Sequence, residues 1–141
     1  MKCRYRTFGT RYLEKINTFF VSSVYDERYE RMARRIARDA KVRSFVYAAV
    51  DQDCFWEILR RASPKIIVPL DSEAFSAFGD PAFEWKGLMY YRLKGYAAIP
   101  ASGVGYSRLV SIIKRVNGMG KLTFNKRAGL LHELLAKERQ K

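Results

Sequence analysis

Apolar residues recur at helical spacing through most of this chain. The clearest pattern covers residues 24–41, where an apolar stripe that includes Met32 and Ile36 lies opposite a face of basic residues. Ser23 and Asp26 have the spacing of a capping signal, and acidic residues fill the first turn, where the helix dipole favours anions. This stretch is therefore predicted to be an amphipathic helix.

The same spacing predicts further helices on both sides of this segment. They are expected over residues 11–21, from Asp51 or Asp53 to Ser63, from Asp71 or Ser72 to Gly79, over residues 84–96, from Ser107 to Val116 and from Asn125 onwards. Two apolar runs interrupt the helical pattern. Residues 45–50 fit a strand or a helix. Residues 65–70 have the composition of a buried strand, although Pro69 would remove a hydrogen-bond donor from a central one.

These elements predict an all-α fold. Residues 1–43 are expected to form a basic N-terminal helical arm, and residues 44–141 a C-terminal helical bundle that packs subunits together, with both parts in one structural unit. The length of 141 residues fits one domain, and 48% of them are apolar, enough for a core. No apolar run approaches a membrane span, and no signal-peptide pattern opens the chain, so a soluble protein is expected. An α/β three-layer fold is the alternative.

The charge is large and unevenly distributed. The chain has 27 basic and 14 acidic residues, a net charge of +13. Residues 1–43 carry a net charge of +7, residues 44–86 of −3 and residues 87–141 of +9. A positive excess of this size causes self-repulsion in the free protein, which a polyanionic partner offsets. We therefore expect the two basic ends to contact nucleic-acid phosphates, and the acidic centre to face solvent or a neighbouring subunit.

The candidate phosphate contacts follow from this distribution. The basic face of the helix predicted at residues 24–41 supplies many of them, and the N-terminal segment and the C-terminal third supply the others. The full set is Arg4, Arg6, Arg11, Lys15, Arg28, Arg31, Arg34, Arg35, Arg38, Lys41, Arg43, Lys114, Arg115, Lys126 and Arg127. Because phosphate contacts carry no base code, recognition is expected to be independent of sequence.

No group of residues indicates catalysis, a metal site or a cofactor. Cys3 and Cys54 are far apart in the sequence and His132 is the single histidine, so a metal site is not expected and the two thiols are expected to be reduced. Asp51 and Asp53 fit helix capping better than acid–base catalysis. The protein is therefore expected to be non-enzymatic.

The stretch Arg6–Tyr12 runs into the basic helix, and Leu93–Tyr96 is followed after a break by Leu109–Ile113. These stretches resemble the major coat proteins of rod-shaped and filamentous archaeal viruses. The resemblance implies helical subunits that pair and wrap double-stranded DNA in the A form inside a helical filament. It also implies a structural protein of the virion, assembled in the host cytoplasm, with double-stranded DNA and a second or a related coat subunit as partners.

Two further blocks lie in the centre of the chain: Pro64–Val68 with Ala74 and Gly79, and Ile99–Gly103 with Ser107 and Arg108. They are similar to two blocks of the uracil-DNA glycosylase superfamily. The resemblance implies a strand and a helix for the first block, a loop that enters DNA for the second, and a degenerate DNA-acting enzyme as the alternative function. The water-activating residue and the histidine of that family have no counterpart here. A basic protein of an RNA–protein assembly is the third alternative.

Overall fold

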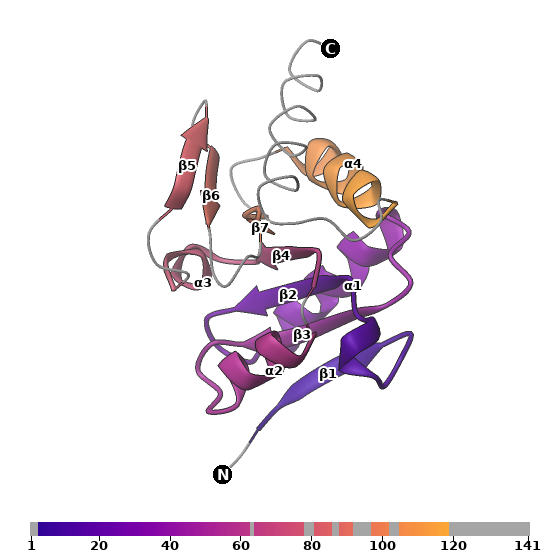
Figure 1. The fold of residues 1–141 in the computed structure, drawn as a ribbon, viewed down its shortest axis with the longest axis vertical. Coiled ribbons are helices and arrows are strands. Elements are labelled where there is room, and N and C mark those ends of the chain that lie inside the picture. The colour runs from indigo at the N-terminus through magenta and orange to yellow at the C-terminus, as the bar shows by residue number, and fades with distance from the viewer. Residues whose placement is uncertain are drawn as a thin grey trace.

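The structure, a computed structural model, describes residues 3–62, 64–77, 81–85, 88–91, 97–101 and 105–118. It contains a five-stranded sheet with the order β1-β3-β2-β4-β7, and β5 pairs with β6 in a separate sheet (Figure 1). The strands are β1 (Tyr5–Phe8), β2 (Thr18–Ser22), β3 (Phe45–Ala49), β4 (Ile66–Pro69), β5 (Pro81–Trp85), β6 (Leu88–Tyr91) and β7 (Ala97–Ala98). The helices are the 3-10 turn η1 (Leu13–Lys15), α1 (Glu27–Asp39), α2 (Phe55–Ala62), α3 (Ser72–Ser76) and α4 (Tyr106–Asn117).

The main sheet has a parallel centre. β3, β2, β4 and β7 run in the same direction, and β1 pairs antiparallel with β3 at one edge. Helix α1 connects β2 to β3, and α2 connects β3 to β4, so each returns the chain from the end of one strand to the start of the next. We call the side where the parallel strands end the carboxyl edge, and the side where they begin the amino edge.

The all-α prediction is wrong, because the molecule has a mixed α/β fold built on this sheet. Every side chain of residues 18–22 and 45–49 is buried. Strands covered on both faces produce continuous apolar runs, which periodicity cannot separate from a buried helix. The helix predicted over residues 11–21 is instead η1 followed by β2, and the described part of residues 84–96 contains strand. The predicted helical arm of residues 1–43 therefore contains β1, β2 and α1, which belong to the common sheet and its covering layer.

Four predicted helices are confirmed as α1 to α4, and the apolar runs at residues 45–50 and 65–70 are strands. Asp26, rather than Ser23, caps α1, since its carboxylate accepts the backbone N–H of Arg28 at 2.8 Å. Pro69 is the last residue of β4, so its missing N–H falls at the end of the strand.

The helix predicted from Asn125, together with His132 and the candidate contacts Lys126 and Arg127, lies outside the described residues.

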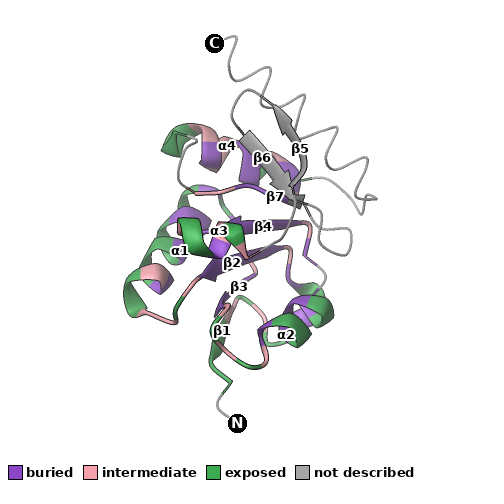
Figure 2. Cartoon of the chain, turned by 90° about the vertical axis from the view of Figure 1, so that its left-hand side faces the viewer, coloured by how far each residue is buried: buried purple, intermediate pink, exposed green. Residues whose placement is uncertain are grey.

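Helices cover both faces of the sheet. Phe20 and Val68 pack on the face covered by α1 and α4. Phe19 and Ile67 pack on the opposite face, against η1, α2 and Ala74 of α3. Figure 2 shows α1 and α2 on opposite sides of the strands. Neighbouring residues of one strand thus supply different cores, because successive side chains point to opposite faces.

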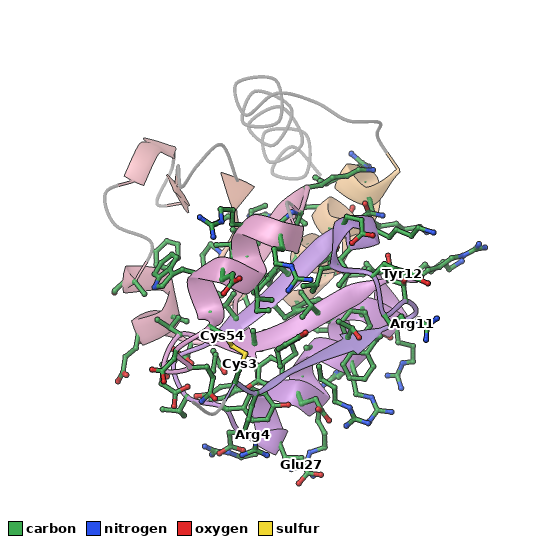
Figure 3. The ribbon with its side chains drawn as sticks, turned by 60° about the horizontal axis from the view of Figure 1, so that its bottom comes forward. Cys3, Arg4, Arg11, Tyr12, Glu27 and Cys54 are labelled. Atoms are coloured by element: carbon green, nitrogen blue, oxygen red, sulfur yellow. A yellow bond between two sulfur atoms is a disulfide. The ribbon has the colours of Figure 1, made fainter. Side chains whose placement is uncertain are left out.

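Two local features fix the edge strand β1. A disulfide joins Cys3, just before β1, to Cys54, just before α2, with a Cα–Cα distance of 5.6 Å (Figure 3). The expectation of two reduced thiols is therefore wrong. Gly9, just after β1, has a φ of +79°, and a Cβ there would lie 1.8 Å from the carbonyl oxygen of Arg43. This position therefore requires glycine.

Candidate nucleic-acid interface

The two edges of the sheet collect charges of opposite sign. Acidic residues lie at the helix starts, on the carboxyl edge: Asp26, Glu27 and Glu30 at α1, Glu57 at α2, and Asp71 and Glu73 at α3. Basic residues lie in the last turns of the crossover helices, toward the amino edge: Arg38 in α1, and Arg60 and Arg61 in α2. Both placements complement the helix dipole.

Hydrogen bonds bring four chain segments together at the amino edge. The hydroxyl of Ser44, before β3, donates to the backbone carbonyl of Lys15, before β2, at 3.1 Å. The backbone N–H of Lys65, before β4, donates to the carbonyl of Asn17 at 2.9 Å. The Lys65 ammonium donates to the carbonyl of Asn117, the last residue of α4, at 3.4 Å. The approaches to three parallel strands and the end of α4 therefore lie side by side.

The basic residues of these segments form the amino-edge cluster. Its members are Arg11, Lys15, Arg38, Lys41, Arg43, Arg60, Arg61, Lys65, Lys114 and Arg115. All are exposed except Lys65 and Arg115, which are half-buried. The acidic residues among the described positions of the same segments are Glu14 and Asp39. The net charge at this edge is therefore strongly positive, and the resulting electrostatic potential attracts polyanions.

Tyr12 orients two members of the cluster. Tyr12 is 46% exposed. The guanidinium carbon of Arg11 lies 5.4 Å and the ammonium of Lys15 lies 5.2 Å from the ring centroid. Cation–π contacts at exposed sites are worth only about 0.5–1 kcal/mol. They position the two charges near the surface without removing them from solvent.

Lys41 occupies a backbone position that favours glycine. It follows the end of α1 with a φ of +56°. Its N–H donates to the carbonyl of Arg38 at 3.2 Å, and the N–H of Val42 donates to that of Ala37 at 2.8 Å. This left-handed helix end costs an ordinary residue about 1–2 kcal/mol relative to glycine. The chain thus places a cation where glycine would be more stable, and such a cost is commonly found where a side chain has a function.

The second half of α1 borders a hollow of about 460 Å³, which we call the α1 hollow. Its lining consists of Phe8, Arg31, Arg34, Arg35, Arg38, Val42 and Phe45. The rings of Phe8 and Phe45 stack with centroids 4.5 Å apart. The guanidinium carbon of Arg34 lies 5.7 Å from the centroid of the Phe8 ring. A row of four arginines from α1 therefore borders an apolar floor.

Contacts with α4 support one side of this arginine row. The guanidinium carbon of Arg35 lies 4.9 Å from the ring centroid of Tyr106, whose hydroxyl donates to Asp39. This hydrogen bond stabilises the ionised carboxylate and lowers the pKa of Asp39. Desolvation and the same bond raise the pKa of Tyr106. Arg38 also donates to Asp39, through Nε at 3.3 Å.

Arg4 and Arg28, two further candidate contacts, lie at the carboxyl edge instead. The backbone N–H and guanidinium of Arg28 donate to Asp26 and lower the pKa of that carboxyl group. The guanidinium carbon of Arg4 lies 4.6 Å from the ring centroid of Tyr25. Figure 3 shows Arg4 and Glu27 near the disulfide, and Arg11 and Tyr12 beyond the far end of β1. The structure therefore does not bring these two arginines together with the amino-edge cluster.

Arg6 lies between the two groups, in the middle of β1. Its Nη1 donates to both carboxylate oxygens of Glu30, at 3.0 and 3.1 Å. The Glu30 side chain is only 9% exposed, whereas that of Arg6 is 58% exposed. Arg6 therefore neutralises a buried carboxylate, so its main role is to stabilise the fold rather than to contact phosphate.

Doubly wound sheets usually bind ligands at the carboxyl edge, at the point where the strand order reverses. That point lies between β2 and β4 here. Ser23, which follows β2, donates its backbone N–H and its hydroxyl to Asp71, at 2.8 and 3.0 Å. The second oxygen of Asp71 caps α3 through the N–H of Ala74, at 2.7 Å. Burial raises the pKa of Tyr47, whose hydroxyl forms a hydrogen bond with the hydroxyl of Ser22. These polar groups therefore satisfy one another's hydrogen-bonding atoms.

Sequence reasoning placed seven members of the amino-edge cluster among its candidates and missed Arg60, Arg61 and Lys65. These three lie in residues 44–86, and the net negative charge of that segment gave no reason to select them. The available signal was local: each stands at the end of a helix or immediately before a strand.

In the described part of the chain, no group of three or more His, Cys, Asp or Glu side chains could hold a metal ion. Nor does that part contain a helix of sufficient length and apolarity to cross a membrane.

No protein-family model and no curated protein matches this chain.

Proposed function

We propose that this protein binds double-stranded DNA through its phosphates, without reading the base sequence, and that the amino-edge cluster makes the contact. The observation that carries the proposal is the convergence of basic residues from four separate segments on one edge of the sheet. Electrostatic attraction to phosphates supplies most of the affinity of such sequence-independent binding.

Helix dipoles alone do not account for this cluster. They explain basic residues within the last turn of a helix, such as Arg38, Arg60 and Arg61. Lys15 belongs to a short 3-10 turn, and Arg43 lies outside any helix, two residues before β3. Functional need, rather than helix stability, is the simpler reason for cations at these positions.

The coat-protein role suggested by sequence is not part of this proposal. The resemblance behind it implies helical subunits, whereas Arg6–Tyr12 lies in β1 and in the turn that follows. The virion location and the coat-subunit partner depend on that role and stay predictions. Phosphate binding does not depend on an all-helical fold and is retained.

The test is the salt dependence of binding to a duplex, measured by fluorescence anisotropy. Each phosphate contact contributes a slope of about −0.9 to the plot of log affinity against log salt concentration. The triple variant Arg38→Gln, Lys41→Gln, Arg43→Gln should reduce the slope by about 2–3. A duplex of unrelated sequence should give the same affinity as the first.

The matched control changes basic residues of the carboxyl edge. The double variant Arg4→Gln, Arg28→Gln removes exposed cations that lie away from the cluster and should leave the slope close to the wild-type value. The proposal fails if the triple variant keeps the wild-type slope, or if the two variants reduce it equally per charge removed.

One observation favours a second function, DNA-directed enzymatic chemistry. Of the first glycosylase-like block, Ile66–Val68 lies in β4 and Ala74 in α3, and Gly79 lies outside the described residues. The second block begins directly after β7, the neighbouring strand. The N–H of Ala101 donates to the carbonyl of Pro69 at 2.8 Å, so the two blocks lie side by side at the carboxyl edge. Residues 102–104 of the second block lie outside the described residues. Release of uracil from a labelled oligonucleotide would establish this function.

A further inference from the structure

The α1 hollow differs from the rest of the basic surface because its row of arginines borders an apolar floor. Val42 is 9% exposed and Phe45 6% exposed at the bottom. The guanidinium carbons of Arg6 and Arg34 lie 5.4 and 5.7 Å from the ring centroid of Phe8. A surface that contacts only the phosphates and sugars of a duplex has no need of an apolar recess beneath its arginines.

The charge in the hollow exceeds what one backbone phosphate requires. Of its four arginines, Arg38 donates to Asp39, which leaves a local excess carried by Arg31, Arg34 and Arg35. A phosphodiester carries one negative charge, whereas a terminal phosphate carries about −1.5 to −2 at neutral pH. Arginine forms bidentate contacts with phosphate oxygens, so several guanidinium groups can bind one terminal phosphate.

The size and composition of the hollow fit a nucleotide. Its volume of about 460 Å³ lies in the range of small-molecule sites. The apolar side chains of the floor, Phe8, Val42 and Phe45, offer a nucleoside an edge to pack against. The arginine row matches a phosphate group, and the apolar floor matches the nucleoside that is joined to it.

On the basis of the proposed function, we propose that the α1 hollow binds a terminal nucleotide. The phosphate of a phosphorylated strand end binds Arg31, Arg34 and Arg35, and its nucleoside packs against the apolar floor. A free nucleoside monophosphate has the same chemistry and occupies the same hollow. The protein thereby distinguishes phosphorylated DNA ends from the interior of the duplex.

The test compares one short duplex with and without a 5′-phosphate, at fixed salt concentration, by fluorescence anisotropy. The phosphorylated duplex should bind about tenfold more tightly, the effect of one additional charge-assisted hydrogen bond. Adenosine 5′-monophosphate should compete with it at lower concentration than inorganic phosphate does.

Two variants remove equal charge and separate the sites. Arg34→Gln with Arg35→Gln removes adjacent exposed arginines of the hollow, and the preference for the phosphorylated end should disappear. Arg60→Gln with Arg61→Gln removes adjacent exposed arginines of α2, and both duplexes should weaken while the preference remains. Circular dichroism confirms that each variant is folded.

The outcomes separate the two proposals. If both duplexes bind wild-type protein equally, the hollow does not recognise ends and this inference is overturned, while phosphate binding by the amino edge stands. If the preference survives in the Arg34, Arg35 variant, the hollow is not its source. If neither duplex binds, the proposed function itself is overturned.

Discussion

The disulfide between Cys3 and Cys54 should supply a large share of the stability of this protein. The two residues are separated by 51 positions, and the bond joins the segment before β1 to the start of α2. In the chain-entropy model, closing a loop of 51 residues removes about 14 cal/mol/K from the unfolded state, which is about 4 kcal/mol at 25 °C. Native disulfides typically supply about 2–4 kcal/mol, and domains of this size have about 5–15 kcal/mol in total.

The assay is equilibrium unfolding in guanidinium chloride, followed by circular dichroism, with and without reductant. Reduction should lower the free energy of unfolding by about 2–4 kcal/mol. The double variant Cys3→Ser, Cys54→Ser should unfold like the reduced protein and should not respond to reductant. Equal free energies for the oxidised and reduced wild type, or two free thiols in denatured protein never exposed to reductant, would refute this reasoning.

Three further predictions concern backbone conformation and pH. Gly9→Ala should destabilise the protein by about 2 kcal/mol or more, because φ is +79° and the Cβ meets the carbonyl of Arg43; an unchanged melting temperature would contradict this. Lys41→Gly should stabilise it by about 1 kcal/mol, since φ is +56° there, and a lower melting temperature would show that the lysine side chain stabilises the fold. The hydrogen bond from Tyr106 lowers the pKa of Asp39. The stabilisation of the folded protein by this bond is therefore fully present above the unfolded-state pKa of Asp39, and it is lost as pH falls through the folded-state pKa. Urea unfolding between pH 2 and pH 6, about the range over which an aspartate titrates, should therefore be less pH-dependent in Tyr106→Phe than in the wild type.

Local sequence pattern was sufficient for the amphipathic helix α1, because one turn of helix places residues three and four positions apart on the same side. The acidic first turn and Asp26 fixed its start. The same pattern failed at Thr18–Ser22, where every side chain is buried. Burial on both faces depends on the layers that other segments supply, so no periodicity within the strand could reveal it.

The sign and size of the net charge follow from the amino-acid sequence alone, and so does the expectation of a polyanionic partner. Which cations lie together follows from the tertiary fold. The strand order brings Lys65 into contact with Asn17 and with the end of α4, which are distant in the chain. It also carries Arg4 to the opposite edge from Lys15, although the two are close in sequence. The edge of the sheet at which a charged residue lies depends on the crossover connections of the chain. Packing over the whole domain sets those connections.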